Sequence, residues 1–168
     1  MAVDWRPAEN SFVKQAFDEA STAKQNELGT VHKFRDVGDT DYGNAYFKYV
    51  QFDTGTGSVA AVATYACYYY TVDGYKNKIV TMDLDDDANG QGAGIMHCAP
   101  TDGQYLWIQI TGPATMGIAF KAGADGNALT SVGATTDGEL DVSAAVTDLV
   151  CAYANDASDD EIICAFPF

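Results

Sequence analysis

The feature that most constrains this chain is a series of turn dipeptides that recurs from residue 73 onward. Asp-Gly or Asn-Gly pairs stand at residues 73–74, 89–90, 102–103, 125–126 and 137–138. Such pairs supply the positive φ angles that tight β-hairpins require. The segments between them are short, and chains of short strands with frequent turns fold as antiparallel sandwiches or barrels.

Strand patterns begin after residue 30. Aromatic and β-branched residues fill 45–52, where Lys48 alternates with apolar neighbours, and residues 59–70 form a run of Ala, Val and Tyr that is typical of a buried strand. Further strands are expected at residues 77–84, 95–99, 104–111, 115–119, 139–142, 149–154 and 161–166. The sequence therefore predicts an all-β, mainly antiparallel body, either a small β-barrel of β-tulip type or a sandwich.

The N-terminal region has a different pattern. Phe12, Ala16 and Phe17 begin a helical spacing that spans residues 11–28, and Gly29 is a suitable stop. A short helix with few large apolar side chains needs a surface on which to dock. We therefore predict an N-terminal arm with one short helix at residues 1–29 and a single β-rich body at residues 30–168.

The chain is strongly acidic. It has 24 Asp and Glu against nine Lys and Arg, a net charge of −15, which argues against direct binding to nucleic acid. No apolar run is long enough to span a membrane and the first residues do not resemble a signal peptide, so no membrane partner is expected. Residues 1–48 have a net charge of −2 and the remainder −13. Either the N-terminal portion lies against another surface, or the charge simply varies along the chain.

The residues that usually carry catalysis are few. Four cysteines (Cys67, Cys98, Cys151 and Cys164) lie in apolar contexts without a CxxC pair, which predicts buried thiols in a protein made in a reducing cytosol. His32 and His97 are expected to be structural, and a His97–Cys98 dyad is excluded within a strand because neighbouring side chains point to opposite faces. No known catalytic motif is present, so we predict no enzymatic activity and no cofactor.

One acidic segment has the spacing of a metal loop. Asp85, Asp87 and Asn89 alternate before Gly90, as in the first half of a calcium loop. The twelfth position is Met96, where such a loop has a bidentate carboxylate. An acidic hairpin turn explains the segment better, so we predict no metal site and keep these three residues as a weak calcium candidate.

Several segments resemble a known family. Residues 94–114 (GIMHCAPTDGQYLWIQITGPA) resemble a motif of the head decoration, or capsid cement, proteins of tailed bacteriophages. The segments Gly29–Thr30 and 43–50 are similar to the N-terminal entry of that family, and residues 121–140 to the part that follows the motif. The resemblance covers about residues 28–166. Leu106 stands where the family commonly has glycine, and the turn at 121–126 is longer than usual.

The resemblance implies a viral structural protein on the outer surface of the virion capsid, after synthesis in the host cytoplasm. Its partners would be the major capsid protein, whose lattice it stabilises, and further copies of itself in a homotrimer. An N-terminal arm would lie over neighbouring capsid subunits, and the body would fold without residues 1–28. Trp5, Phe12 and Phe17 are the candidate capsid contacts, because aromatic side chains bury much area in interfaces. Packing of these residues on the protein's own body remains the alternative.

Two other functions are open. A carbohydrate-binding β-sandwich of adhesin type would use aromatic faces to stack on sugars, and the candidates are Tyr65, Tyr68, Tyr69, Tyr70, Tyr75 and Tyr105. Neighbouring tyrosines alternate between the faces of a strand, so at most two of the three at 68–70 share one platform. A small hydrolase is the third class, and the lack of a suitable nucleophile disfavours it.

Overall fold

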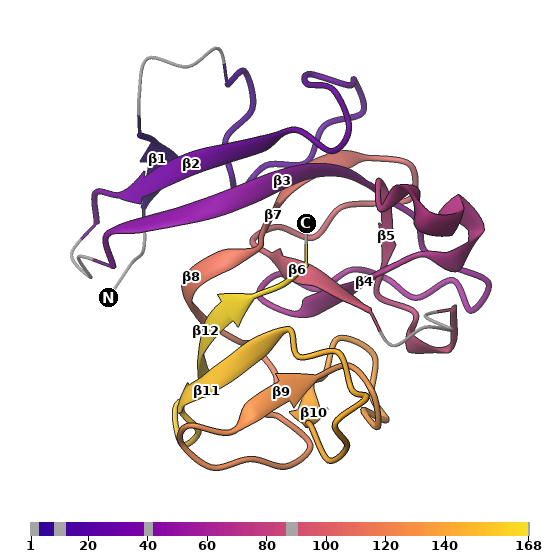
Figure 1. Cartoon of the computed structure of the whole chain (residues 1–168). Helices are drawn as coiled ribbons and strands as arrows, with labels where there is room; N and C mark the ends of the chain where they lie inside the picture. The colour runs from indigo at the N-terminus through magenta and orange to yellow at the C-terminus, as the bar shows by residue number, and fades with distance from the viewer. Residues whose placement is uncertain (1–3, 9–12, 39–41, 87–90, 168) are drawn as a thin grey trace.

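The computed structural model describes residues 4–8, 13–38, 42–86 and 91–167 (Figure 1). Within these residues the chain forms strands, two short 3-10 helices and irregular connections. The first six strands are β1 (Trp5–Pro7), β2 (Val31–Asp36), β3 (Asn44–Phe52), β4 (Ala66–Tyr69), β5 (Ile79–Thr81) and β6 (Gly92–Met96). The other six are β7 (Tyr105–Gln109), β8 (Thr111–Thr115), β9 (Ala128–Thr130), β10 (Asp141–Val142), β11 (Ala152–Asp156) and β12 (Glu161–Ala165). The 3-10 helices are η1 (Thr71–Lys76) and η2 (Leu84–Asp86).

Five strands close into a small barrel. β3 pairs in parallel with β5, and β5 is followed by β4, β6 and β7 through antiparallel pairs. β7 then pairs with β3 and completes the circuit. β1 and β2 extend this sheet outward from the N-terminal half of β3. The prediction of an all-β, mainly antiparallel body is confirmed.

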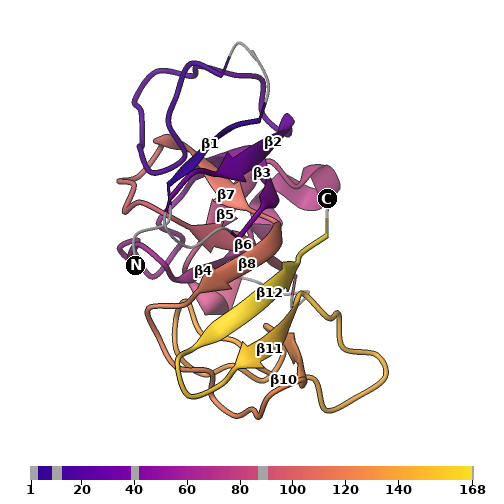
Figure 2. The same cartoon turned by 90° about the vertical axis from the view of Figure 1, so that its left-hand side faces the viewer.

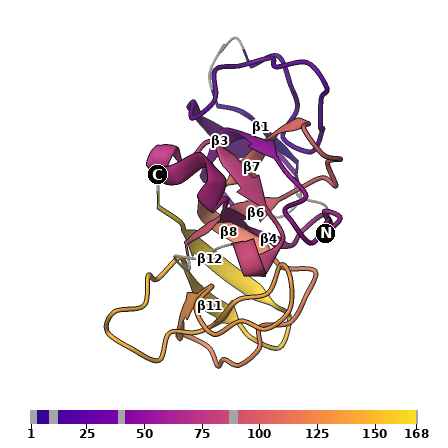
Figure 3. The same cartoon turned by 90° about the vertical axis from the view of Figure 1, so that its right-hand side faces the viewer.

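A second sheet packs against the barrel. Its strand order is β10-β9-β11-β12-β8, and every pair in it is antiparallel. β8 follows β7 after a single residue, so the chain passes directly from the barrel into the second sheet. Figures 1 and 2 show the barrel with its β1–β2 extension above and the second sheet below. Figure 3, seen from the side opposite to that of Figure 2, shows the same two layers.

β3 contributes to two separate cores. Val50 and Phe52 belong to the main core, which the barrel shares with the inner side of the second sheet. Phe47 and Tyr49, which point to the other face, belong to an aromatic core. The aromatic core consists of Trp5, Phe17, Phe34, Ala45, Phe47, Tyr49 and Trp107. Both faces of this strand are therefore covered by other parts of the protein.

The expected helix at residues 11–28 is wrong for the part that the structure describes. Residues 13–30 contain only turns, bends and one isolated bridge between Ser21 and Tyr105. The Ser21 amide donates to the Tyr105 carbonyl oxygen, and the Tyr105 amide donates back to Ser21. The segment is thus tied to the sheet by backbone hydrogen bonds at Ser21. A helix of small side chains gains too little alone to compete with covering the aromatic core.

The N-terminal segment is part of the folded body rather than a detached arm. Trp5 lies in β1, which pairs with β2, and is 3% exposed. Phe17 is 9% exposed and makes edge contacts with Phe47 and His97 at centroid distances of 6.0 and 5.3 Å. The sequence led us to expect that the body folds without residues 1–28. Because these contacts bury the segment against the body, we expect instead that a chain without residues 1–28 does not fold cooperatively.

Replacing Phe17 with Ala is expected to lower the free energy of unfolding by about 3 kcal/mol, because it opens a cavity in the aromatic core. Urea unfolding followed by tryptophan fluorescence measures the change. Lys14→Ala, at an exposed position of the same segment, is the control and should change stability little. Deleting residues 1–28 should expose Phe34 and Phe47 and abolish cooperative unfolding. A truncated chain that unfolds cooperatively would contradict this account.

Candidate functional site

The segment that carries the family resemblance forms the joint between barrel and second sheet. It runs through β6, β7 and β8, and two of its glycines stand where backbones crowd together. A Cβ atom at Gly94 would lie 2.7 Å from the Gln109 carbonyl oxygen. At Gly112, φ is +87°, and a Cβ atom would lie 3.0 Å from that of Ala45. Both positions therefore require glycine.

Gln109 fastens this joint with its side chain. Its amide Nε2 donates to the carbonyl oxygens of Thr111 at 3.1 Å and Pro113 at 2.7 Å. Its Oε1 lies 2.8 Å from Nε2 of His97, which must carry the proton because the amide hydrogens of Gln109 are already used. Burial lowers the pKa of His97, so the neutral ring is favoured. His97 is thus a hydrogen-bonded residue, and it lies with Cys98 in a bend after β6 and not in the strand expected at residues 95–99.

The predicted capsid contacts lie in different surroundings from those expected. Trp5 and Phe17 are buried in the aromatic core, so the alternative that they pack on the protein's own body is the one observed. Phe12 lies outside the described residues. Neither Trp5 nor Phe17 is available as an exposed anchor in this conformation.

Two of the exposed apolar side chains lie next to each other on the outer face of the second sheet. Tyr153 of β11 and Ile163 of β12 are directly opposite each other and are 47% and 40% exposed. Pro113 of β8 is opposite Ile163, and Ala128 of β9 is opposite Tyr153. We call these four residues the outer row. Sequence reasoning missed it, although the alternation at 152–154 and 162–164 was a usable signal.

Of the three residues of the weak calcium candidate, the structure describes Asp85. Asp85 is exposed, and its amide donates to the Asp83 carboxylate, while Asp87 and Asn89 lie outside the described residues. Nearby carboxylates accept from backbone amides: Asp86 from Thr56 at 2.6 Å, and Asp83 from Gly57 at 2.7 Å. Among the described residues no group of three or more His, Cys, Asp or Glu side chains is arranged to hold a metal. The absence of a calcium effect stays a prediction.

The tyrosines suggested for sugar stacking do not form an exposed platform among the described side chains, and that of Tyr75 lies outside them. Tyr68 and Tyr69 are 0% and 4% exposed, and the Tyr68 hydroxyl donates to the Glu139 carbonyl oxygen at 2.7 Å. Tyr65, Tyr70 and Tyr105 are half-buried. The Tyr65 ring also lies against Gly138, where a Cβ atom would approach it to 2.6 Å. Most of these rings therefore serve packing.

Lys48 is a buried amine beside the C-terminal segment. Its Nζ donates to the Tyr69 hydroxyl at 2.9 Å and lies 4.7 Å from the centre of that ring. The Tyr69 hydroxyl in turn donates to the Pro167 carbonyl oxygen at 3.0 Å. No carboxylate among the described residues pairs with Lys48. Burial therefore lowers the pKa of Lys48 to about 8.

Lys48→Met is expected to stabilise the protein at pH 7 by about 1–2 kcal/mol, a value reduced for solvent screening of the charge. The folded pKa near 8 lies below the ordinary 10.5, so charged Lys48 opposes folding below pH 8. This destabilisation of the folded state decreases as the pH rises from 8 towards 10.5. Unfolding in urea at pH 7 and pH 10.5 should show the advantage of Lys48→Met shrinking. An advantage that does not change with pH would contradict this explanation.

The cysteines behave as buried apolar residues. Cys67, Cys151 and Cys164 are buried, and Cys98 is half-buried. Burial raises the pKa of Cys67 and Cys164, and it raises that of Cys98 to about 12. The Cys151 thiol donates to the Leu129 carbonyl oxygen at 3.4 Å. Because thiolates are the reacting species, these thiols should be unreactive at neutral pH.

Alkylation with iodoacetamide at pH 7.5 is expected to label none of the cysteines rapidly in the folded protein, with slow labelling confined to Cys98. All four should react after unfolding in urea, since burial then no longer suppresses the thiolate. Mass spectrometry of the intact chain and of its peptides counts and locates the labels. Rapid labelling of Cys67 or Cys164 in the folded protein would show that the core opens readily.

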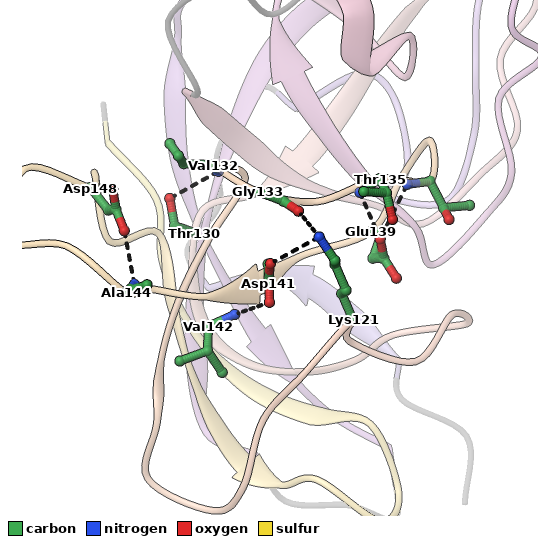
Figure 4. Close-up of polar contacts among 11 residues, drawn as sticks. Lys121, Thr130, Val132, Gly133, Thr135, Glu139, Asp141, Val142, Ala144 and Asp148 are labelled. Carbon is green, nitrogen blue, oxygen red and sulfur yellow. Dashed lines mark hydrogen bonds and ion pairs between the residues drawn. The ribbon is translucent and has the colours of Figure 1, made fainter.

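The basic residue in the loops of the second sheet, Lys121, is bound by other residues of these loops. Lys121 is the only Lys or Arg after residue 78. Its Nζ lies 3.5 Å from the Asp141 carboxylate and donates to the Gly133 carbonyl oxygen (Figure 4). The buried Glu139 carboxylate accepts from the amides of Thr135 and Thr136 at 3.0 and 3.1 Å. These contacts fix the loops around β10 and leave this part of the protein acidic.

Comparison with known proteins identifies no relative. No protein-family model, no curated protein and no solved structure matches the chain. No helix among the described residues is long and apolar enough to cross a membrane.

Proposed function

We propose that this chain is a decoration, or cement, protein of a tailed-bacteriophage head. It binds the outer surface of the major capsid protein lattice and stabilises the head. The protein acts by contact and burial, without catalysis or a cofactor. Its copies associate as a homotrimer, and it carries no direct nucleic-acid or membrane contact.

One observation carries the proposal: the residues of the resemblance form a single structural unit. Gly94, Gln109 and Gly112 hold the joint on which both sheets depend. A resemblance at such positions concerns the whole fold, because other residues there would not allow the chain to pass from barrel to sheet. The family's fold serves binding to a capsid, so the same use is proposed here.

The outer row provides the contact surface in this proposal. Tyr153 and Ile163 stand side by side on the outer face of the second sheet and are 47% and 40% exposed. Exposed aromatic and aliphatic side chains next to each other are typical of the centres of interfaces. This surface replaces Trp5 and Phe17, which the fold uses internally.

The two other functions receive less support. A carbohydrate-binding module requires exposed aromatic faces, and Tyr68 and Tyr69 are buried. A hydrolase requires an activated nucleophile, and the pKa of each of the two thiols nearest His97 in the sequence, Cys98 and Cys67, is raised rather than lowered. Capsid decoration needs neither feature.

A binding experiment with capsids tests the proposal. Expanded heads assembled without this chain, from the virus that encodes it, are mixed with the purified chain and sedimented. The chain should cosediment to a saturating ratio and should raise the temperature at which the heads disrupt. Failure to bind at saturating chain concentration would overturn the proposal.

Variants of the outer row locate the contact. Tyr153→Ala combined with Ile163→Ala is expected to weaken binding to the heads by about 2–4 kcal/mol, because two adjacent anchors are lost. Val146→Ala, at an exposed apolar position elsewhere on the second sheet's loops, is the matched control and should bind normally. Circular dichroism confirms that each variant is folded. Unchanged binding of the double variant would place the contact on another surface.

A further inference from the structure

The extension of the barrel has one aromatic and one basic face. Antiparallel pairing places Arg6 opposite Arg35, and Lys33 opposite Tyr46, on one face of β1, β2 and β3. All four side chains are exposed. We call them the basic face. The other face carries Trp5, Phe34 and Phe47, which are buried in the aromatic core.

The basic face concentrates positive charge in an acidic protein. Arg6 and Arg35 are directly opposite each other, an arrangement in which like charges destabilise a sheet. Arg6 is paired with Asp4 at 2.8 Å. Arg35 and Lys33 have no ion pair within the described part of the chain. An anionic surface placed here would relieve the repulsion and pair both free cations.

The chain itself presents a complementary surface. Residues 122–168 contain no Lys, Arg or His. The turn between β11 and β12 gathers several acids, because the Ala157 amide donates to Asp125 and brings that residue to the turn. We call the acids there the acidic turn: Asp125, Asp156, Asp159, Asp160 and Glu161. Among the described residues Asp159 is exposed and its carboxylate makes no hydrogen bond or ion pair.

We propose that copies of this chain associate head to tail, with the basic face of one copy on the acidic turn of the next. The two surfaces lie on different sheets, the basic face on β1–β3 and the acidic turn between β11 and β12 (Figures 1 and 2), and no ion pair joins them among the described residues of one copy. A contact between two different surfaces closes into a ring when the rotation per copy allows it. Tyr46, 42% exposed and opposite Lys33 on β3, supplies an apolar contact beside the cations.

This inference deepens the self-association included in the proposed function by naming the surfaces that meet, but it is argued from charge and register and does not depend on capsid binding. Other acids are less suitable partners. Asp83, Asp86 and Asp102 already accept hydrogen bonds from backbone amides of residues 54–57. Asp125, Asp156 and Glu161 of the acidic turn also accept hydrogen bonds within the chain, so the contact rests mainly on Asp159.

Sedimentation velocity of the full chain at low and high salt tests the inference. The wild type should form a defined oligomer at low salt and dissociate as salt rises, since the contact is electrostatic. Arg35→Glu and Asp159→Arg should each weaken association at least about tenfold. The double variant Arg35→Glu/Asp159→Arg restores opposite charges across the contact and should recover most of the association.

Matched controls separate this contact from a general charge effect. Lys14→Glu and Asp85→Arg change exposed charges outside the two surfaces and should associate like the wild type. Lys33→Glu provides a second test of the basic face should Arg35→Glu unfold. A wild type that is monomeric at low salt, or a double variant no better than either single one, overturns the inference. Loss of capsid binding by Arg35→Glu with a monomeric wild type would instead show that the basic face binds the capsid.

Discussion

The backbone at Gly112 is the constraint on which the rest of the structure depends. With φ at +87° and Ala45 in contact, it lets the chain leave the barrel as β7 and continue at once as β8. The Gln109 amide then holds the carbonyl oxygens of Thr111 and Pro113, on both sides of this residue. β8 is the edge on which β12 pairs, and β11 and β9 follow. A side chain at residue 112 would therefore disturb the position of the whole second sheet.

The sequence predicted best those elements whose pattern is local. The strand expected at 45–52 is observed at Asn44–Phe52, because its alternation needs no information from elsewhere. The strand expected at 59–70 is observed only at Ala66–Tyr69. Thr64 adopts a φ of +68° and breaks the run, which composition does not indicate. The helix failed for a similar reason, since Gln15 and Ser21 bond to Tyr105 of the sheet, a long-range contact that the local pattern does not indicate.

The candidate contacts were harder to predict because exposure depends on which strands pair. Trp5 and Tyr153 are both large aromatic residues in short strands. Trp5 is buried because β1 pairs with β2 beside Phe47, and Tyr153 is exposed because β11 lies in a sheet with one free face. No property of either residue distinguishes them. Only the register, a long-range property, separates a core residue from a contact surface.

The same register explains part of the charge pattern. Residues 31–36 alternate, so burying Phe34 in the aromatic core turns Lys33 and Arg35 to the opposite face. Their exposure thus follows from packing alone. Packing does not explain why residue 6 is an arginine. Any polar side chain would suit an exposed site opposite Arg35, and an acidic side chain would stabilise the cross-strand pair. The Asp4 carboxylate, 2.8 Å from Arg6, offsets part of the repulsion between the two arginines, so Arg35 is the one of the pair that has no ion pair among the described residues.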